Sequence, residues 1–117
     1  MSYAIASLYY GLPLKVGDSY RASGRTEEVE EAIDLRIPGF ESFYSGHAGV
    51  IPAVFGVDME VHMDECDHHT ELSKFRLQPT DEEKEEYELL FNALPSALKA
   101  DLAVFGHPRV FLLWSTS

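Results

Sequence analysis

The stretch AVFGVDMEVHM, residues 53–63, decides the fold. Apolar side chains occupy every second position, and glycine or polar residues stand between them. A period of two places the two sets on opposite faces of a β-strand. The pattern therefore predicts a strand whose buried face is made of Phe55, Val57, Met59, Val61 and Met63.

A second alternating stretch, ELSKFRLQP at residues 71–79, follows after a polar interval. We predict that residues 53–77 form one antiparallel hairpin in which Met59 faces Phe75 and Val57 faces Leu77. The same register sets opposite charges across from each other on the polar face, and each such pair contributes a few tenths of a kcal/mol up to about 1 kcal/mol. These pairs are Glu60 with Lys74 and Asp58 with Arg76.

The N-terminal part of the chain predicts a strand, a loop and a short helix. Residues 3–10 are apolar and aromatic, and we expect Gly11 and Pro13 to end this strand. The following stretch, LKVGDSYRASGRT, is typical of a loop. Thr26 is a suitable N-cap for a short helix, which we expect to continue as an extended segment up to Pro38.

The C-terminal part predicts two helices and a strand. Thr80 and Glu83 form a capping-box pattern, and Pro95 separates the first helix from a second one at residues 96–104. The first helix has an apolar stripe formed by Tyr87, Leu90, Phe91 and Leu94. Gly106 is a suitable C-cap for the second helix. The apolar run RVFLLWST, residues 109–116, predicts a central strand buried on both faces.

Together these elements predict a single domain over residues 1–117. Its class is α+β, with a mainly antiparallel sheet, two C-terminal helices packed on one face and a final central strand.

The chain carries a net charge of −11, and the charge is unevenly distributed. Residues 58–88 hold twelve acids and three bases, a net charge of −9, whereas residues 89–117 have a net charge of +1. Such a surface repels nucleic acid and anionic membranes, so a partner selected by charge would be a basic protein. The candidate partner-binding acids are Asp58, Glu60, Asp64, Glu65, Asp67, Glu82 and Glu86. The alternative is that the acids serve solubility alone.

The composition also indicates in which compartment of the cell the protein is expected. The longest apolar runs fall short of the roughly 20 residues that a membrane helix needs. The N-terminus has no basic residue before its apolar part, so a signal peptide is not expected. One cysteine allows no intramolecular disulfide. These features favour the cytoplasm and no contact with membranes.

The stretch HMDECDHHTE, residues 62–71, raises the question of a metal site. Its candidate ligands are His62, Cys66, His68 and His69. Their spacing matches no zinc motif, so we interpret them as a polar hairpin loop, with metal binding as the alternative. The acidic neighbours Glu65 and Asp67 disfavour the thiolate that a nucleophilic Cys66 would need.

The one locally basic loop offers an alternative site for a small anion. Lys15, Arg21 and Arg25 surround two glycines whose backbone amides suit a phosphate, but the loop fits no phosphate-binding motif. His47, flanked closely by glycines, is a further candidate for this ligand. We interpret both segments first as solvated loops.

No recognised catalytic motif is present, and we assign no catalytic residue and no cofactor. The sequence favours a small non-catalytic binding protein, in its strongest form an inhibitor that presents carboxylates to a nucleic-acid-binding surface of another protein. A binder or enzyme for an anionic ligand and a metal-binding domain are the alternatives.

Overall fold

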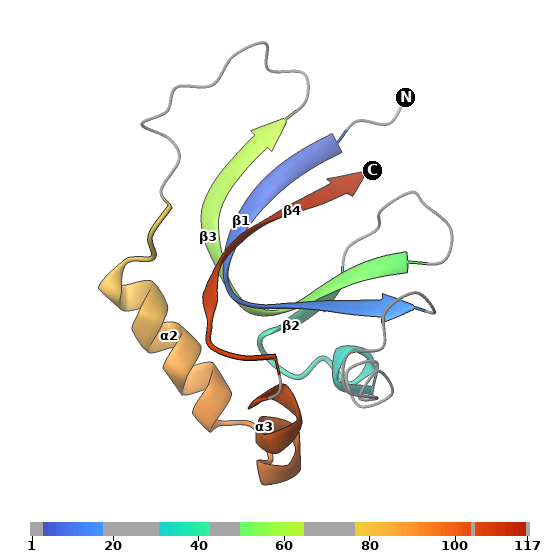
Figure 1. Cartoon of the computed structure of the whole chain (residues 1–117), viewed down its shortest axis with the longest axis vertical. Helices are drawn as coiled ribbons and strands as arrows, with labels where there is room; N and C mark the ends of the chain where they lie inside the picture. The colour runs from blue at the N-terminus through green and yellow to red at the C-terminus, as the bar shows by residue number, and fades with distance from the viewer. Residues whose placement is uncertain (1–3, 18–30, 43–49, 65–76, 104, 117) are drawn as a thin grey trace.

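A computed structural model describes residues 4–17, 31–42, 50–64, 77–103 and 105–116. Its four strands are β1 (Ala4–Gly17), β2 (Phe40–Ser42), β3 (Val50–Asp64) and β4 (Arg109–Thr116). They form one antiparallel sheet in the order β2-β3-β1-β4. Figure 1 shows β1 and β3 as long, strongly bent strands, with α2 and α3 on the outer side of the bend. The α+β class and the antiparallel sheet are confirmed.

Strand β3 follows the alternation of its sequence as far as Met59. Phe55, Val57 and Met59 are buried, as predicted. Beyond Met59 the pairing with β1 shifts, because Ser7 pairs with His62 while Tyr9 pairs with Asp58, so residues 59–61 stand opposite Leu8 alone. Glu60 adopts a φ of 58° inside this bulge, and its backbone N–H donates to Asp58 Oδ1 at 2.7 Å. The bulge breaks the predicted alternation.

Strand β1 is longer than predicted, because it runs through Gly11 and Pro13 to Gly17. Gly11 pairs with Gly56 of β3, and a Cβ atom at either position would collide with the backbone of the other strand. The two glycines therefore permit a close approach of the strands, and the prediction that Gly11 ends the strand was wrong. Leu14, predicted as loop, lies in β1 and is buried.

Helix α2 (Asp81–Asn92) begins as its sequence predicts. The Glu83 N–H donates to Thr80 Oγ1 at 3.2 Å, and the Thr80 N–H donates to Glu83 Oε1 at 2.8 Å. These two bonds satisfy amides that have no partner inside the helix. The helix ends before Pro95, and α3 (Ser96–Ala103) follows, with Gly106 at a φ of 93° after its end.

The predicted short helix is described only at residues 31–34, and Thr26 lies outside the described residues. The extended segment expected up to Pro38 is absent from the described residues 35–37. Instead, Arg36 adopts a φ of 54°, and the amides of Arg36 and Ile37 donate to the carbonyls of Ile33 and Ala32. This Schellman motif ends the helix, and the extended segment begins only at β2.

The core lies between the sheet and the helices. Tyr87 of α2 and Leu98 and Leu102 of α3 are buried there, so both helices cover one face of the sheet, as predicted. Phe55 is fully buried at its centre, with ring centroids 4.8 Å from Phe40 and 5.6 Å from Tyr87. No helix among the described residues is both long and apolar enough to cross a membrane.

Strand β4 and Leu77 lie in other places than the sequence predicts. Strand β4 has the predicted bounds but pairs only with β1 among the described strands, and Leu112 is 46% exposed. It lies at the edge of the described sheet, so the prediction of a central strand was wrong. The second hairpin arm at residues 65–76 lies outside the described residues, and the pairing of Met59 with Phe75 stays a prediction. Leu77 lies in a bend and is 75% exposed, so its predicted place on a buried face was wrong.

Candidate functional site

The outer side of α2 carries an acidic surface with one apolar residue in it. Helical periodicity places Tyr87, Leu90 and Phe91 towards the core, where Tyr87 is buried and the other two are half-buried. The same periodicity directs residues at spacings of three, four and seven to the opposite side. We call this set the α2 acidic face, and it consists of Glu82, Glu85, Glu86 and Leu89, all of which are exposed.

The carboxylates of the α2 acidic face are available to a partner. Within the described part of the chain, Glu82, Glu85 and Glu86 make no side-chain hydrogen bond or ion pair. Leu89 is 72% exposed and lies one turn beyond Glu85 and Glu86, at the C-terminal end of this face. An exposed leucine beside unpaired charges of one sign combines an apolar anchor with a polar rim, as in many protein interfaces.

The structure divides the predicted acidic surface into two parts. Asp58 follows Val57, which packs on the helix side of the sheet, and Asp58 pairs across the ladder with Tyr9. Strand alternation therefore puts Asp58 on the face opposite α2. Glu60 is exposed within the bulge of β3, and Asp64 is the last residue of that strand. Glu65 and Asp67 lie outside the described residues, so only Glu82 and Glu86 are shown to share one surface.

Asp58 belongs to a polar network on the face of the sheet away from the helices. Ser7 Oγ lies 2.7 Å from His62 Nδ1, and His62 Nε2 lies 3.5 Å from Asp58 Oδ2. In the neutral tautomer with its proton on Nε2, His62 Nδ1 accepts a hydrogen bond from the Ser7 hydroxyl, and the Nε2–H points at the Asp58 carboxylate. The bulge at Glu60 brings Asp58 and His62 together, because it fits residues 58–62 of β3 opposite only residues 7–9 of β1.

A serine, a histidine and an aspartate in line are the components of a hydrolytic triad, but the burial of Ser7 argues against that use. Ser7 is only 6% exposed, in the middle strand pair of the sheet, so its hydroxyl is closed to a substrate. The network instead satisfies a buried hydroxyl. Ser7 was not singled out in the sequence, because its contact with His62 arises from the bulge and not from any local motif.

The metal interpretation concerned the same histidine. In the described part of the chain no group of three or more histidine, cysteine or acidic side chains could hold a metal ion. His62 is half-exposed and contacts Ser7 and Asp58. Cys66, His68 and His69 lie outside the described residues, so a site built by those residues stays a prediction.

A second polar pair lies beside this network. The hydroxyl of Tyr9 donates to Glu41 Oε2 at 3.2 Å, joining β1 to β2 across β3. Burial first, and then the nearby carboxylates of Asp58 and Glu41, raise the pKa of Tyr9 above its ordinary value. Tyr9 therefore stays a neutral hydrogen-bond donor over the physiological pH range.

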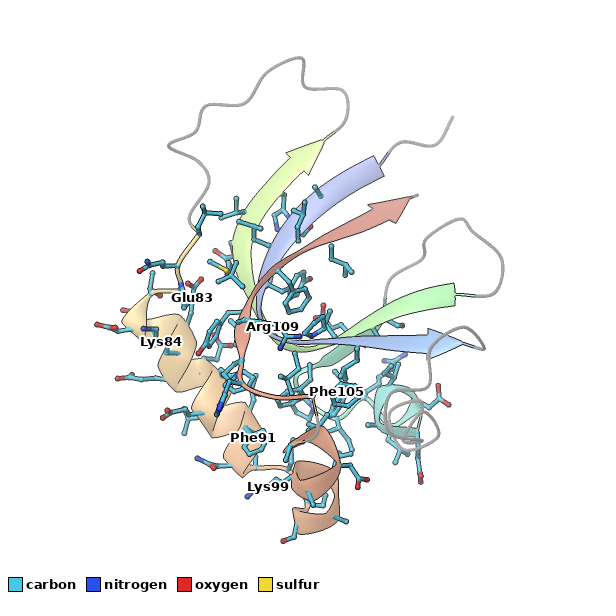
Figure 2. All side chains as sticks on the ribbon, in the orientation of Figure 1. Glu83, Lys84, Phe91, Lys99, Phe105 and Arg109 are labelled. Carbon is cyan, nitrogen blue, oxygen red and sulfur yellow. The ribbon has the colours of Figure 1, made fainter. Side chains whose placement is uncertain are left out.

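A shallow apolar hollow of about 330 Å³ opens where α2, α3 and the start of β4 meet. It is lined by Tyr87, Phe91, Leu102, Ala103, Gly106, His107 and Pro108. Burial, with a smaller effect of Tyr10, raises the pKa of Tyr87 to about 12. Beside the hollow, Arg109 Nη1 donates to the carbonyls of Phe105 and His107 at 3.4 Å and 3.2 Å, and Figure 2 shows Arg109 above Phe105 at this turn.

Of the residues predicted to bind a small anion, only Lys15 lies in the described part of the chain. Lys15 lies within β1, opposite Pro52 of β3, and not in a loop. Arg21, Arg25 and His47 lie outside the described residues. A site for a small anion at these positions stays a prediction.

Comparison with protein families, with curated proteins and with solved structures gives no match for this chain.

Proposed function

We propose that this chain is a small acidic binding protein without catalytic activity of its own, and that the α2 acidic face engages a basic surface of a partner protein. The observation that carries the proposal is the exposed Leu89 on one helix face with Glu82, Glu85 and Glu86, three carboxylates that have no partner among the described residues. Leu89 would provide the apolar anchor, and the three carboxylates would select a basic surface around it.

In its strongest form, the protein is an inhibitor of a nucleic-acid-binding protein. Carboxylates on successive turns of a helix lie about 5–6 Å apart at their Cβ atoms, so they form a compact row of negative charge. Lysine and arginine side chains that normally contact phosphates would bind such a row. The net charge of −11 makes direct binding of nucleic acid by this chain unfavourable. The cytoplasm is the proposed location, because the single cysteine needs no oxidising compartment.

The test compares the proteins that tagged variants capture from extracts of the source cells. The variant E82K/E86K reverses two charges on the α2 acidic face. The matched control E31K/D34K changes the net charge equally at two exposed acids away from that face. We expect a protein with a basic surface to be retained by the wild type and by the control, and lost from E82K/E86K, because the position of the charge matters and not its sum.

A third variant, R21A/R25A, separates the proposal from the anion-ligand alternative. It should capture the same partner as the wild type. If R21A/R25A loses the partner while E82K/E86K keeps it, the basic loop carries the function and the α2 acidic face does not. If E82K/E86K and E31K/D34K lose it equally, the interaction depends on net charge alone.

A further inference from the structure

The outer edge of β4 lacks the features that normally keep a sheet edge from pairing. An edge strand presents unpaired backbone N–H and C=O groups, and monomeric proteins blunt such edges with charges, prolines or bulges. Residues 110–114 of β4 read VFLLW, without a charge or a proline. The ladder between β4 and β1 runs without a register shift. No other strand among the described residues pairs with β4.

The helices also leave β4 less covered than the other long strands. Among the strands, α2 packs mainly on β3 and β1. Leu112 is 46% exposed, and Val110, Phe111 and Leu113 are half-buried. The apolar side chains of β4 are therefore partly open to solvent on the strand that also offers the backbone groups. Figure 1 shows this strand beside β1.

The charge distribution favours a second copy of this acidic chain at that edge. Residues 58–88 carry a net charge of −9, whereas residues 89–117, which include β4, carry +1. In the sheet, β1 separates β4 from β3, where the acidic segment begins. Two copies that meet at β4 thus keep β3 of each copy behind β1 and β4, so the acids of β3 stay away from the contact and repel each other less.

The sequence of β4 is also compatible with two-fold symmetry. An antiparallel pair of identical strands centred on Leu112 places residue 110 opposite 114, and 111 opposite 113, so that only apolar residues face each other at the centre. Arg109 then lies opposite Ser115 of the other copy, and no like charges meet. The contact is self-complementary and closes after two copies, as expected of a symmetric dimer.

We propose that two copies of this chain associate through antiparallel pairing of their β4 edges about a two-fold axis at Leu112, and so form a continuous eight-stranded sheet. The axis is perpendicular to the sheet, so the helices of both copies lie on the same face. Strand pairing over so short a segment buries less surface than a permanent dimer, and we expect a dissociation constant of about 1–100 μM. This proposal is independent of the α2 acidic face.

Sedimentation velocity of the full chain, at concentrations from below to above that range, tests the dimer. We expect the wild type to shift from monomer to dimer as its concentration rises. L112E places two carboxylates side by side at the axis and should weaken dimerisation by at least about tenfold. L35E adds the same charge at an exposed leucine outside the sheet and outside the α2 acidic face, and should leave dimerisation unchanged. Circular dichroism establishes that both variants are folded.

A cysteine cross-link tests the register even if L112E fails to fold. In a C66S background, L112C places two thiols opposite each other at the axis, within the Cα separation of about 4.4–6.8 Å that a disulfide needs. We expect oxidation to give a cross-linked dimer with L112C and none with L35C, which lies at an exposed position outside the sheet. A wild type that stays monomeric throughout overturns the proposal. A dimer that persists in folded L112E, or that L112C does not cross-link, overturns it as well.

Discussion

Single residues in this protein are understood through their partners across the sheet. Ser7 lies in β1 and His62 in β3, far apart in the sequence, yet their side-chain atoms are 2.7 Å apart. The sequence marked His62 only as a possible metal ligand. Its contact with Ser7 depends on the bulge at Glu60, which no local pattern announces, since a glutamate at a φ of 58° is unfavourable on its own.

Replacing His62 with alanine should destabilise the fold by about 1–2 kcal/mol, because the buried Ser7 hydroxyl loses its partner. S7A should cost less, because it removes the buried hydroxyl itself. The double variant S7A/H62A should be less destabilised than the sum of the two single variants. Urea denaturation of the three variants measures these differences. Strict additivity would show that the bond between Ser7 and His62 contributes nothing.

Elements were predicted well where local chemistry determines them. The alternation from Phe55 to Met59, the capping box at Thr80 and the break at Pro95 all appear as expected, because each depends on neighbours within a few residues. Gly11 was misinterpreted, because a strand-ending glycine and a close-approach glycine look alike until the opposing strand is known. The same limit applies to β4, since an apolar run does not reveal whether one neighbour or two flank it.

Changing Gly11 to alanine should therefore destabilise the fold strongly. Its Cβ would collide with the carbonyl of Phe55 and with Gly56, both backbone groups that cannot rotate away. We expect a loss of about 3 kcal/mol or a failure to fold. The control is G106A, whose Cβ meets nothing within 4 Å and should cost only about 1 kcal/mol, through its backbone conformation. Thermal denaturation compares the two, and equal small effects would mean that the strands do not approach closely at Gly11.

At the scale of the whole molecule, the sequence predicted an acidic surface but not where on the molecule the acids lie. The excess of acids at residues 58–88 is a property of composition. Its division between the α2 acidic face and the opposite face of the sheet depends on how β3 and α2 pack, which composition does not contain. Leu89 was likewise not predicted as a contact, although helical periodicity alone places it on the same face as Glu82, Glu85 and Glu86. If β4 pairs as proposed, each dimer presents two such faces, and a bivalent partner would bind with increased avidity.

The most direct test of the proposed function is the association rate constant with the captured basic partner, measured by stopped flow at low and high salt. We expect the wild-type rate to fall by about tenfold or more as salt screens the charges. E82K/E86K should lose most of the low-salt rate and most of the salt dependence, whereas E31K/D34K should stay close to the wild type. L89A should mainly speed dissociation, since Leu89 acts as an anchor and not as a charge. Equal rates for E82K/E86K and the wild type at low salt would contradict a binding role for the α2 acidic face.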